Sequence, residues 1–156
     1  MQTKRFLGAL DHERIVKAIQ EAEARSRGEV RVHVSQRPIQ EAQPDTPPEA
    51  AVQTAAARQF ETLGMTQTAE RNGVLLFVAP VSQRFAVVGD EGIHARCGPD
   101  FWKDVAAAVE ADFRAGRFTD GIVKGVARVG DALATHFPRT KDATDRNELA
   151  DEVTED

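Results

Sequence analysis

Two adjacent carboxylates, Asp90 and Glu91, stand between Gly89 and Gly92 and are the side chains of this chain best suited to chemistry. They directly follow a β-branched run that ends at Val88, so they lie where a predicted strand gives way to a turn. A turn of this composition presents acidic oxygens, which are the ligands that hard cations such as Ca²⁺ prefer.

The strands that position this turn can be predicted from the apolar pattern. An unbroken apolar run from Val74 to Ala79, a short polar break and a second run from Phe85 predict a buried hairpin. An earlier strand has valines at alternate positions from Val30 to Val34. Arg31 and His33 occupy the other face of that strand, which predicts that this face is less buried.

Apolar residues at helical spacing predict the remaining elements. The first helix begins at the N-cap Asp11, the second at a capping box that starts with Thr46, and the last ends before Pro138. The order of elements is helix, strand, helix, strand, strand, helix, helix. This order predicts an α/β protein, a three-layer α/β/α sandwich with a small mixed β-sheet flanked by helices. The expected helical segments are residues 11–26, 46–63, 93–97, 99–115 and 119–137.

This topology brings separated residues to one end of the sheet. The first two strands are joined by a helix and should be parallel, so both begin at the same end. The third strand follows a tight reversal and should return to that end. Glu29, Asn72, Asp90 and Glu91 would then share one rim. Carboxylates with an amide oxygen form a ligand set suited to Ca²⁺ or Mg²⁺.

Two other interpretations compete with a metal site. In the first, Glu29 and Glu91 are solvated turn residues and Asn72 merely supplies an Asn–Gly turn. In the second, the site lies at the opposite end of the sheet, following the usual rule for open α/β sheets. The residues at that end that would attract an anion, such as a small phosphate ligand, are Arg37, Gln83 and Arg84.

Histidine and cysteine chemistry is weakly supported. His94 and Cys97 are three residues apart, but without a second pair of ligands they make a poor zinc site. Cys97 has no identifiable base, so a packed thiol is the better interpretation. His94 has no identifiable group to orient it as a general acid.

Composition limits the function classes. The 156-residue chain has a net charge of −5, which argues against nucleic-acid binding. No apolar run approaches the length of a transmembrane helix, and no export signal is visible. With a single cysteine, these features predict a cytoplasmic protein. Residues 1–138 should form one domain, and residues 139–156, with three basic and seven acidic residues, should form a flexible tail.

Four motifs occur in order between Ile15 and Phe137. They are Gly28-Glu29-Val30-Arg31-Val32, Asn72-Gly73-Val74-Leu75-Leu76-Phe77-Val78-Ala79, Val88-Gly89-Asp90-Glu91-Gly92, and Phe113-Arg114-Ala115-Gly116-Arg117-Phe118-Thr119-Asp120-Gly121-Ile122. Together they resemble the motifs of the TPM domain family. The tail, residues 147–153, is similar to the ending of a bacterial subset of that family that lacks a membrane segment.

The resemblance implies an α/β/α sandwich, divalent-cation binding in some members and acid phosphatase activity in some plastid members, while other members are interaction modules. Carried over by position, the acidic cleft would involve Glu29, Asn72, Asp90 and Glu91. The chain departs from better-known members by having Arg71, instead of an aspartate, before Asn72. A cationic side chain there would weaken metal affinity or engage a phosphate.

Three functional hypotheses follow. The first is an interaction module in which the cation-occupied rim docks a protein partner. The second is a weak, metal-assisted acid phosphatase with Arg71 or Arg84 as charge partner for the phosphoryl group. The third is metal-free binding through the tail, with Leu149 and Val153 one helical turn apart on an acidic segment that folds against a partner.

Overall fold

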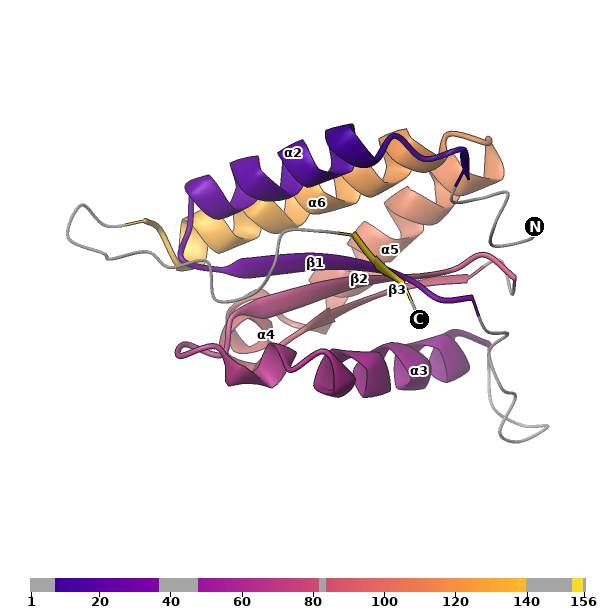
Figure 1. The fold of residues 1–156 in the computed structure, drawn as a ribbon. Helices are drawn as coiled ribbons and strands as arrows, with labels where there is room; N and C mark the ends of the chain where they lie inside the picture. Colours follow the sequence, from indigo (N-terminus) through magenta and orange to yellow (C-terminus); the bar gives the residue numbers. More distant parts are fainter. Residues whose placement is uncertain (1–7, 37–47, 82–83, 140–152, 156) are drawn as a thin grey trace.

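The computed structural model describes residues 8–36, 48–81, 84–139 and 153–155. Helices and strands alternate in the first half of the chain, and helices dominate the second half (Figure 1). The elements are α2 (His12–Ala24), β1 (Glu29–Val34), α3 (Pro48–Thr62), η1 (Met65–Gln67), β2 (Gly73–Ala79), β3 (Arg84–Gly89), α4 (Glu91–Cys97), α5 (Pro99–Arg114), α6 (Phe118–His136) and β4 (Val153–Glu155).

The strands form one mixed sheet in the order β3-β2-β1-β4. Strand β1 is parallel to β2 and to β4, while β2 and β3 are antiparallel, as the crossover and the tight reversal predicted. Helices α2, α5 and α6 lie over one face of the sheet and α3 lies over the other (Figure 1). The predicted α/β/α sandwich is therefore confirmed.

Each face of the sheet has its own apolar core. Alternate strand residues such as Leu76 pack under α2, α5 and α6, and their neighbours such as Leu75 pack against α3. Asp11 caps α2 as predicted, accepting a hydrogen bond from the Arg14 amide at 3.2 Å. The expected capping residue Thr46 lies outside the described residues. No helix in the described ranges has both the length and the apolar character needed to cross a membrane.

Strand β1 differs from the prediction because both of its faces are buried. His33 is only 1% exposed, and Arg31 is buried as well. On this face the His33 ring stacks on Phe77 of β2, with a centroid distance of 5.8 Å. The expectation of a half-solvated face was wrong because alternating polar residues do not reveal which other parts of the chain pack against them.

The fourth strand was not predicted. Val153 to Glu155 pair in parallel with Val32 to Val34 along the edge of β1. The Thr154 hydroxyl lies 2.9 Å from Nδ1 of His33, a residue for which the sequence suggested no partner. Val153 therefore belongs to a strand and not to the helical face proposed for the tail, and Leu149 lies outside the described residues.

Candidate functional site

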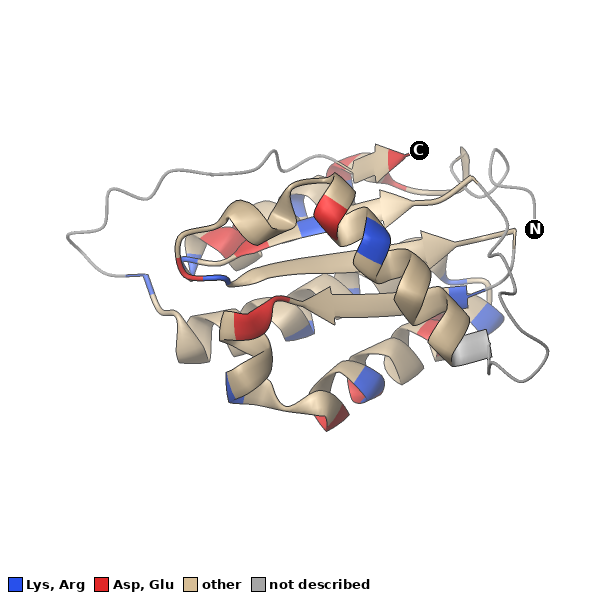
Figure 2. Cartoon of the chain, turned by 90° about the horizontal axis from the view of Figure 1, so that it is seen from below, with Lys and Arg blue, Asp and Glu red and all other residues tan. Residues whose placement is uncertain are grey.

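The predicted rim exists at the end of the sheet where β1 and β2 begin. Glu29 is the register partner of Gly73 on β1 and β2, and the Asp90 amide donates to the Gly73 carbonyl at 2.9 Å. Asn72 directly precedes Gly73. Three segments far apart in sequence therefore meet at one edge, and acidic and basic residues gather there where β3 ends (Figure 2).

The strongest polar contact at the rim joins Arg71 and Asp90. The guanidinium binds both carboxylate oxygens, with Nε to Oδ2 at 2.7 Å and Nη2 to Oδ1 at 2.8 Å. Asp90 is 6% exposed, and its Oδ1 also accepts the Glu91 amide at 2.8 Å, which caps α4. The hydrogen bond with Asp90 raises the pKa of Arg71 above its usual value. The Asp90 carboxylate is therefore already neutralised by the protein.

The backbone around Arg71 is unusual and is held in place by α4. Arg71 has φ of 53°, a left-handed conformation that an L-residue with a long side chain rarely adopts. Its carbonyl accepts the Gly92 amide at 2.8 Å. A Cβ on Gly92 would collide with the carbonyl oxygens of Glu70 and Arg71, so this close approach requires glycine. The glycine after the two acidic residues thus fixes the turn that carries Arg71.

Asn72 and Glu29 are both buried at this rim, at 1% and 4% exposure. The Asn72 amide nitrogen Nδ2 donates to the Arg27 carbonyl at 3.1 Å, which orients the side chain. Its carbonyl oxygen Oδ1 is buried and has no hydrogen-bond partner among the described residues. A buried acceptor of this kind is costly unless something occupies it.

Glu91 is placed differently from the other three predicted residues. Its side chain is 80% exposed, and its Oε2 lies 3.7 Å from Nη1 of Arg71. The structure therefore brings Glu29, Asn72 and Asp90 together in buried positions and leaves Glu91 at the solvent-facing edge of the same rim.

A second arginine–carboxylate pair lies at the rim and was not predicted. Arg27 binds Glu70 through Nε to Oε2 at 2.8 Å and Nη2 to Oε1 at 3.1 Å. The hydrogen bond from Arg27 lowers the pKa of Glu70 below its usual value. The sequence offered one signal for this pair, which is that both residues lie next to predicted rim segments. Arg27 precedes the motif that contains Glu29, and Glu70 precedes Arg71.

The comparisons with known proteins agree with this fold. The family model described as TPM domain matches residues 1–132. The chain belongs to the TPM domain family. It is similar to the BA42 protein of the psychrophilic bacterium Bizionia argentinensis, whose NMR structure shares 34% sequence identity and superposes with a TM-score of 0.76. That match covers 93% of this chain and 92% of BA42. No protein in the curated comparison set matches.

The rim of this TPM domain fits a divalent cation only if Arg71 moves. Carboxylate and amide oxygens are appropriate ligands, and Asn72 Oδ1 is a buried acceptor without a hydrogen-bond partner among the described residues. The Asp90 carboxylate, however, is taken by the guanidinium. Within the described ranges, no cluster of three or more histidine, cysteine, aspartate or glutamate residues is arranged to hold a metal ion. A cation would have to replace Arg71 on Asp90.

The other predicted candidates have structural partners. Nδ1 of His94 accepts a hydrogen bond from the Trp102 indole at 2.9 Å, so the expectation that nothing orients this histidine was wrong. Cys97 is half-buried, and burial raises the pKa of its thiol, as expected for a packed cysteine.

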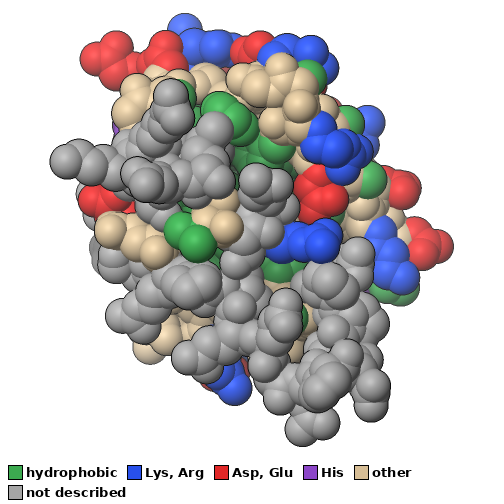
Figure 3. All heavy atoms as spheres, turned by 90° about the vertical axis from the view of Figure 1, so that its right-hand side faces the viewer, with side chains coloured by type: hydrophobic (Ala, Val, Ile, Leu, Met, Phe, Trp, Pro, Cys, Tyr) green, Lys and Arg blue, Asp and Glu red, His purple; other side chains and the backbone are tan. Residues whose placement is uncertain are grey.

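The alternative anion site at the opposite end of the sheet cannot be assembled from the described residues. Arg84 begins β3 at that end, but Arg37 and Gln83 lie outside the described ranges. In the view of this end, acidic and basic side chains are interspersed on the described surface (Figure 3). This arrangement does not favour an anion there over the rim.

Proposed function

We propose that this TPM domain is an interaction module whose rim binds a divalent cation, Ca²⁺ or Mg²⁺, and docks a protein partner. Asp90 and Asn72 would be the central ligands, and Glu29 and Glu91 would complete the set. The observation that carries the proposal is the buried Oδ1 of Asn72, which lacks a hydrogen-bond partner among the described residues and belongs to the same rim as the buried Glu29 and Asp90. A cation on this atom would satisfy it.

Arg71 sets the affinity of the proposed site. Its side chain is 40% exposed, so it can swing into water, whereas Asp90 is buried and its carboxylate is costly to leave without a positive partner. A cation therefore competes with the guanidinium for the same carboxylate. We expect a dissociation constant in the weak range found for extracellular calcium modules, on the order of 10⁻⁴ to 10⁻³ M.

Docking would use the charge that the cation brings to the rim. When bound, the cation supplies a positive centre with coordination positions that a carboxylate of a partner can fill. Glu91, at the exposed edge, would lie between the site and such a partner. Displaced Arg71 would add a second positive group at the surface.

Phosphatase activity is the second candidate, and the rim supports it less well. Hydrolysis of a phosphomonoester needs a proton donor for the leaving oxygen. His94, the histidine nearest to the rim in sequence, accepts the Trp102 indole at Nδ1, so only its Nε2 could act as that donor. Arg71, the expected charge partner for a phosphoryl group, is bound to Asp90.

Thermal melting with added Ca²⁺ or Mg²⁺ tests the proposal. At ten times the dissociation constant, the wild type should gain about 3 to 5 °C in Tm. Arg71→Ala should reach the same gain at a several-fold lower cation concentration because the competitor is gone. Arg27→Ala is the matched control, since it removes the other rim guanidinium but leaves Asp90 paired. It should respond as the wild type does.

Loss of the response in Asp90→Asn would support the proposed ligands. A wild-type melt that neither cation changes, together with an unchanged melt of Arg71→Ala, would contradict the proposal. Hydrolysis of a phosphomonoester at acid pH that is lost in Asp90→Asn would instead favour the phosphatase.

A further inference from the structure

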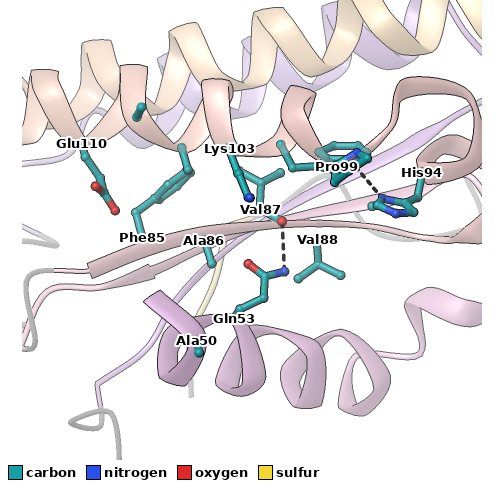
Figure 4. A pocket seen from close by; sticks show the side chains of 14 residues that line it. Ala50, Gln53, Phe85, Ala86, Val87, Val88, His94, Pro99, Lys103 and Glu110 are labelled. Carbon is teal, nitrogen blue, oxygen red and sulfur yellow. Dashed lines mark hydrogen bonds between the residues drawn. The ribbon is translucent and has the colours of Figure 1, made fainter. Parts of the chain in front are cut away.

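A groove outside the rim runs along the edge strand β3. It encloses about 650 Å³ between α3 and α5, with β3 as its floor (Figure 4). Ala50 of α3 and Ala106 of α5 contribute to its apolar walls, and Gly89 and His94 lie at its rim end. Because Asp90 follows Gly89, the groove begins beside the proposed cation site.

The backbone of β3 can accept another strand in this groove. β3 is the last strand on its side of the sheet within the described residues. The Asp90 amide donates to the Gly73 carbonyl of β2. Because antiparallel strands hydrogen-bond at every second residue, the peptide groups of Val88 and Ala86 also point towards β2. The peptide groups of Val87 and its alternate neighbours therefore face the groove. Such a row of edge groups is a template for strand addition.

The Val87 carbonyl confirms that these peptide groups point into the groove, and its present hydrogen bond is weak. The Val87 carbonyl accepts a hydrogen bond from Nε2 of Gln53 on α3 at 3.4 Å. This distance is at the long end for a hydrogen bond, so an incoming amide can replace Gln53 at little cost. Gln53 and Lys103 point towards Val87 from the opposite walls (Figure 4).

The groove is also lined by two charged side chains of α5, Lys103 and Glu110 (Figure 4). Lys103 lines it from α5 and has no hydrogen bond or ion pair within the described ranges. An ammonium group beside apolar walls is complementary to a carboxylate on an otherwise small or β-branched peptide.

We propose that this groove binds an extended peptide segment of a partner protein, which adds as a strand to β3 and places an acidic side chain near Lys103. The inference names the partner class of the interaction module and so rests on that part of the proposed function. It does not depend on the rim holding a cation. Backbone hydrogen bonds would supply affinity, and Lys103 would favour peptides that carry an acidic side chain beside it.

Trp102 provides the readout, because it is the only tryptophan of the chain and lines the groove. The probes are two eight-residue peptides of alternating threonine and valine, with either a central glutamate or a central lysine. The glutamate peptide should change Trp102 fluorescence saturably and bind the wild type about threefold more tightly than the lysine peptide. Lys103→Glu should reverse that preference.

Ala107→Phe, which fills the groove from an exposed position on α5, should abolish binding while circular dichroism confirms the fold. Equal affinities of the two peptides for both the wild type and Lys103→Glu, or no saturable change in the wild type, would overturn the inference. Peptide binding is also measured in the presence of a metal chelator and with the Asp90→Asn variant, which separates the groove proposal from the cation-site proposal. Peptide binding that persists there supports the groove even if no cation binds the rim.

Discussion

Arg71 combines an unfavourable backbone conformation with the best-satisfied ion pair of the rim. Its φ of 53° is costly for any residue with a Cβ. The conformation persists because the Thr68 carbonyl accepts the Arg71 amide, Gly92 donates to the Arg71 carbonyl, and Asp90 holds the side chain. Strain of this kind concentrates at functional sites.

Two substitutions separate the effect of the strained backbone on stability from the effect of the ion pair. Arg71→Gly and Arg71→Ala both remove the guanidinium, but only glycine relieves the left-handed conformation. We therefore expect Arg71→Gly to have a free energy of unfolding about 1 kcal/mol higher than Arg71→Ala in urea denaturation. Equal unfolding free energies for the two variants would show that the turn has no strain to relieve.

Asp112 links α5 to α6 and should control part of the stability in acid. Arg117 hydrogen-bonds its Oδ1 through Nε and Nη2, at 3.0 and 2.8 Å, and Lys124 lies 3.3 Å from Oδ2. These contacts, the Arg117 hydrogen bond first, lower the pKa of Asp112 below its usual value. A lowered pKa stabilises the folded state above the unfolded pKa of about 3.9, and this stabilisation is lost as the pH falls through the folded value.

Melting curves of wild type and Asp112→Asn from pH 7 to pH 2 test this linkage. The wild type should have the higher Tm at neutral pH, and the difference should shrink as the pH falls below about 4. Asp131→Asn is the control, since Asp131 pairs with Arg25 but is 72% exposed, and its effect should be small at every pH. A difference for Asp112→Asn that stays constant down to pH 2 would contradict the assignment.

At this scale, the sequence predicts positions better than partners. The strand directions expected from a crossover and a tight reversal were sufficient to bring Glu29, Asn72 and Asp90 to one rim. It could not reveal that Arg71 binds Asp90, because that contact depends on one left-handed residue. The bond between His94 and Trp102 joins two different helices and has no periodic signal either.

At the scale of elements, the side of β1 that faces away from β2 is covered along much of its length, whereas the edge strand β3 has one occupied carbonyl among its described contacts. On β1, the Glu23 carboxylate accepts the Val30 amide at 2.8 Å and β4 pairs with Val32 to Val34. On β3, Gln53 occupies one carbonyl. Covering an edge strand prevents uncontrolled pairing with other chains. The acidic C-terminal segment thus has a structural role in the sheet.

Deletion of residues 140–156 tests that role. Loss of three strand pairs and of the partly buried Val153 should lower the free energy of unfolding by about 1 to 2 kcal/mol. Thr154→Val is the companion variant, because it keeps a strand-forming side chain but removes the hydroxyl near His33. A urea midpoint of the deletion variant identical to that of the full chain would show that β4 adds nothing to stability.

The helices and three strands were predictable because apolar spacing and capping residues encode them locally. β4 was not, since a three-residue strand of Val, Thr and Glu forms only where another strand offers an open edge. The double burial of β1 was missed for the same reason: β4 reaches its edge from a distant part of the chain, and Phe77 of β2 stacks on His33.

At the scale of the whole molecule, the order of elements was enough to predict the sandwich that this chain shares with BA42. The same order cannot fix the chemistry of the rim. The described rim pairs two arginines with two carboxylates, Arg27 with Glu70 and Arg71 with Asp90. A TPM domain built in this way carries its own positive charge at the acidic edge, so the proposed cation would have to compete with Arg71 for Asp90.

The most direct test of this account is a Ca²⁺ titration of ¹⁵N-labelled protein followed by NMR at two side chains, Asn72 Nδ2 and Arg71 Nε. With Ca²⁺ raised to on the order of 10 mM, both resonances should shift saturably with one dissociation constant, as the guanidinium leaves Asp90 and the ion reaches Asn72 Oδ1. Neither should shift in Asp90→Asn. Wild-type resonances that stay fixed throughout the titration would contradict the proposed cation site.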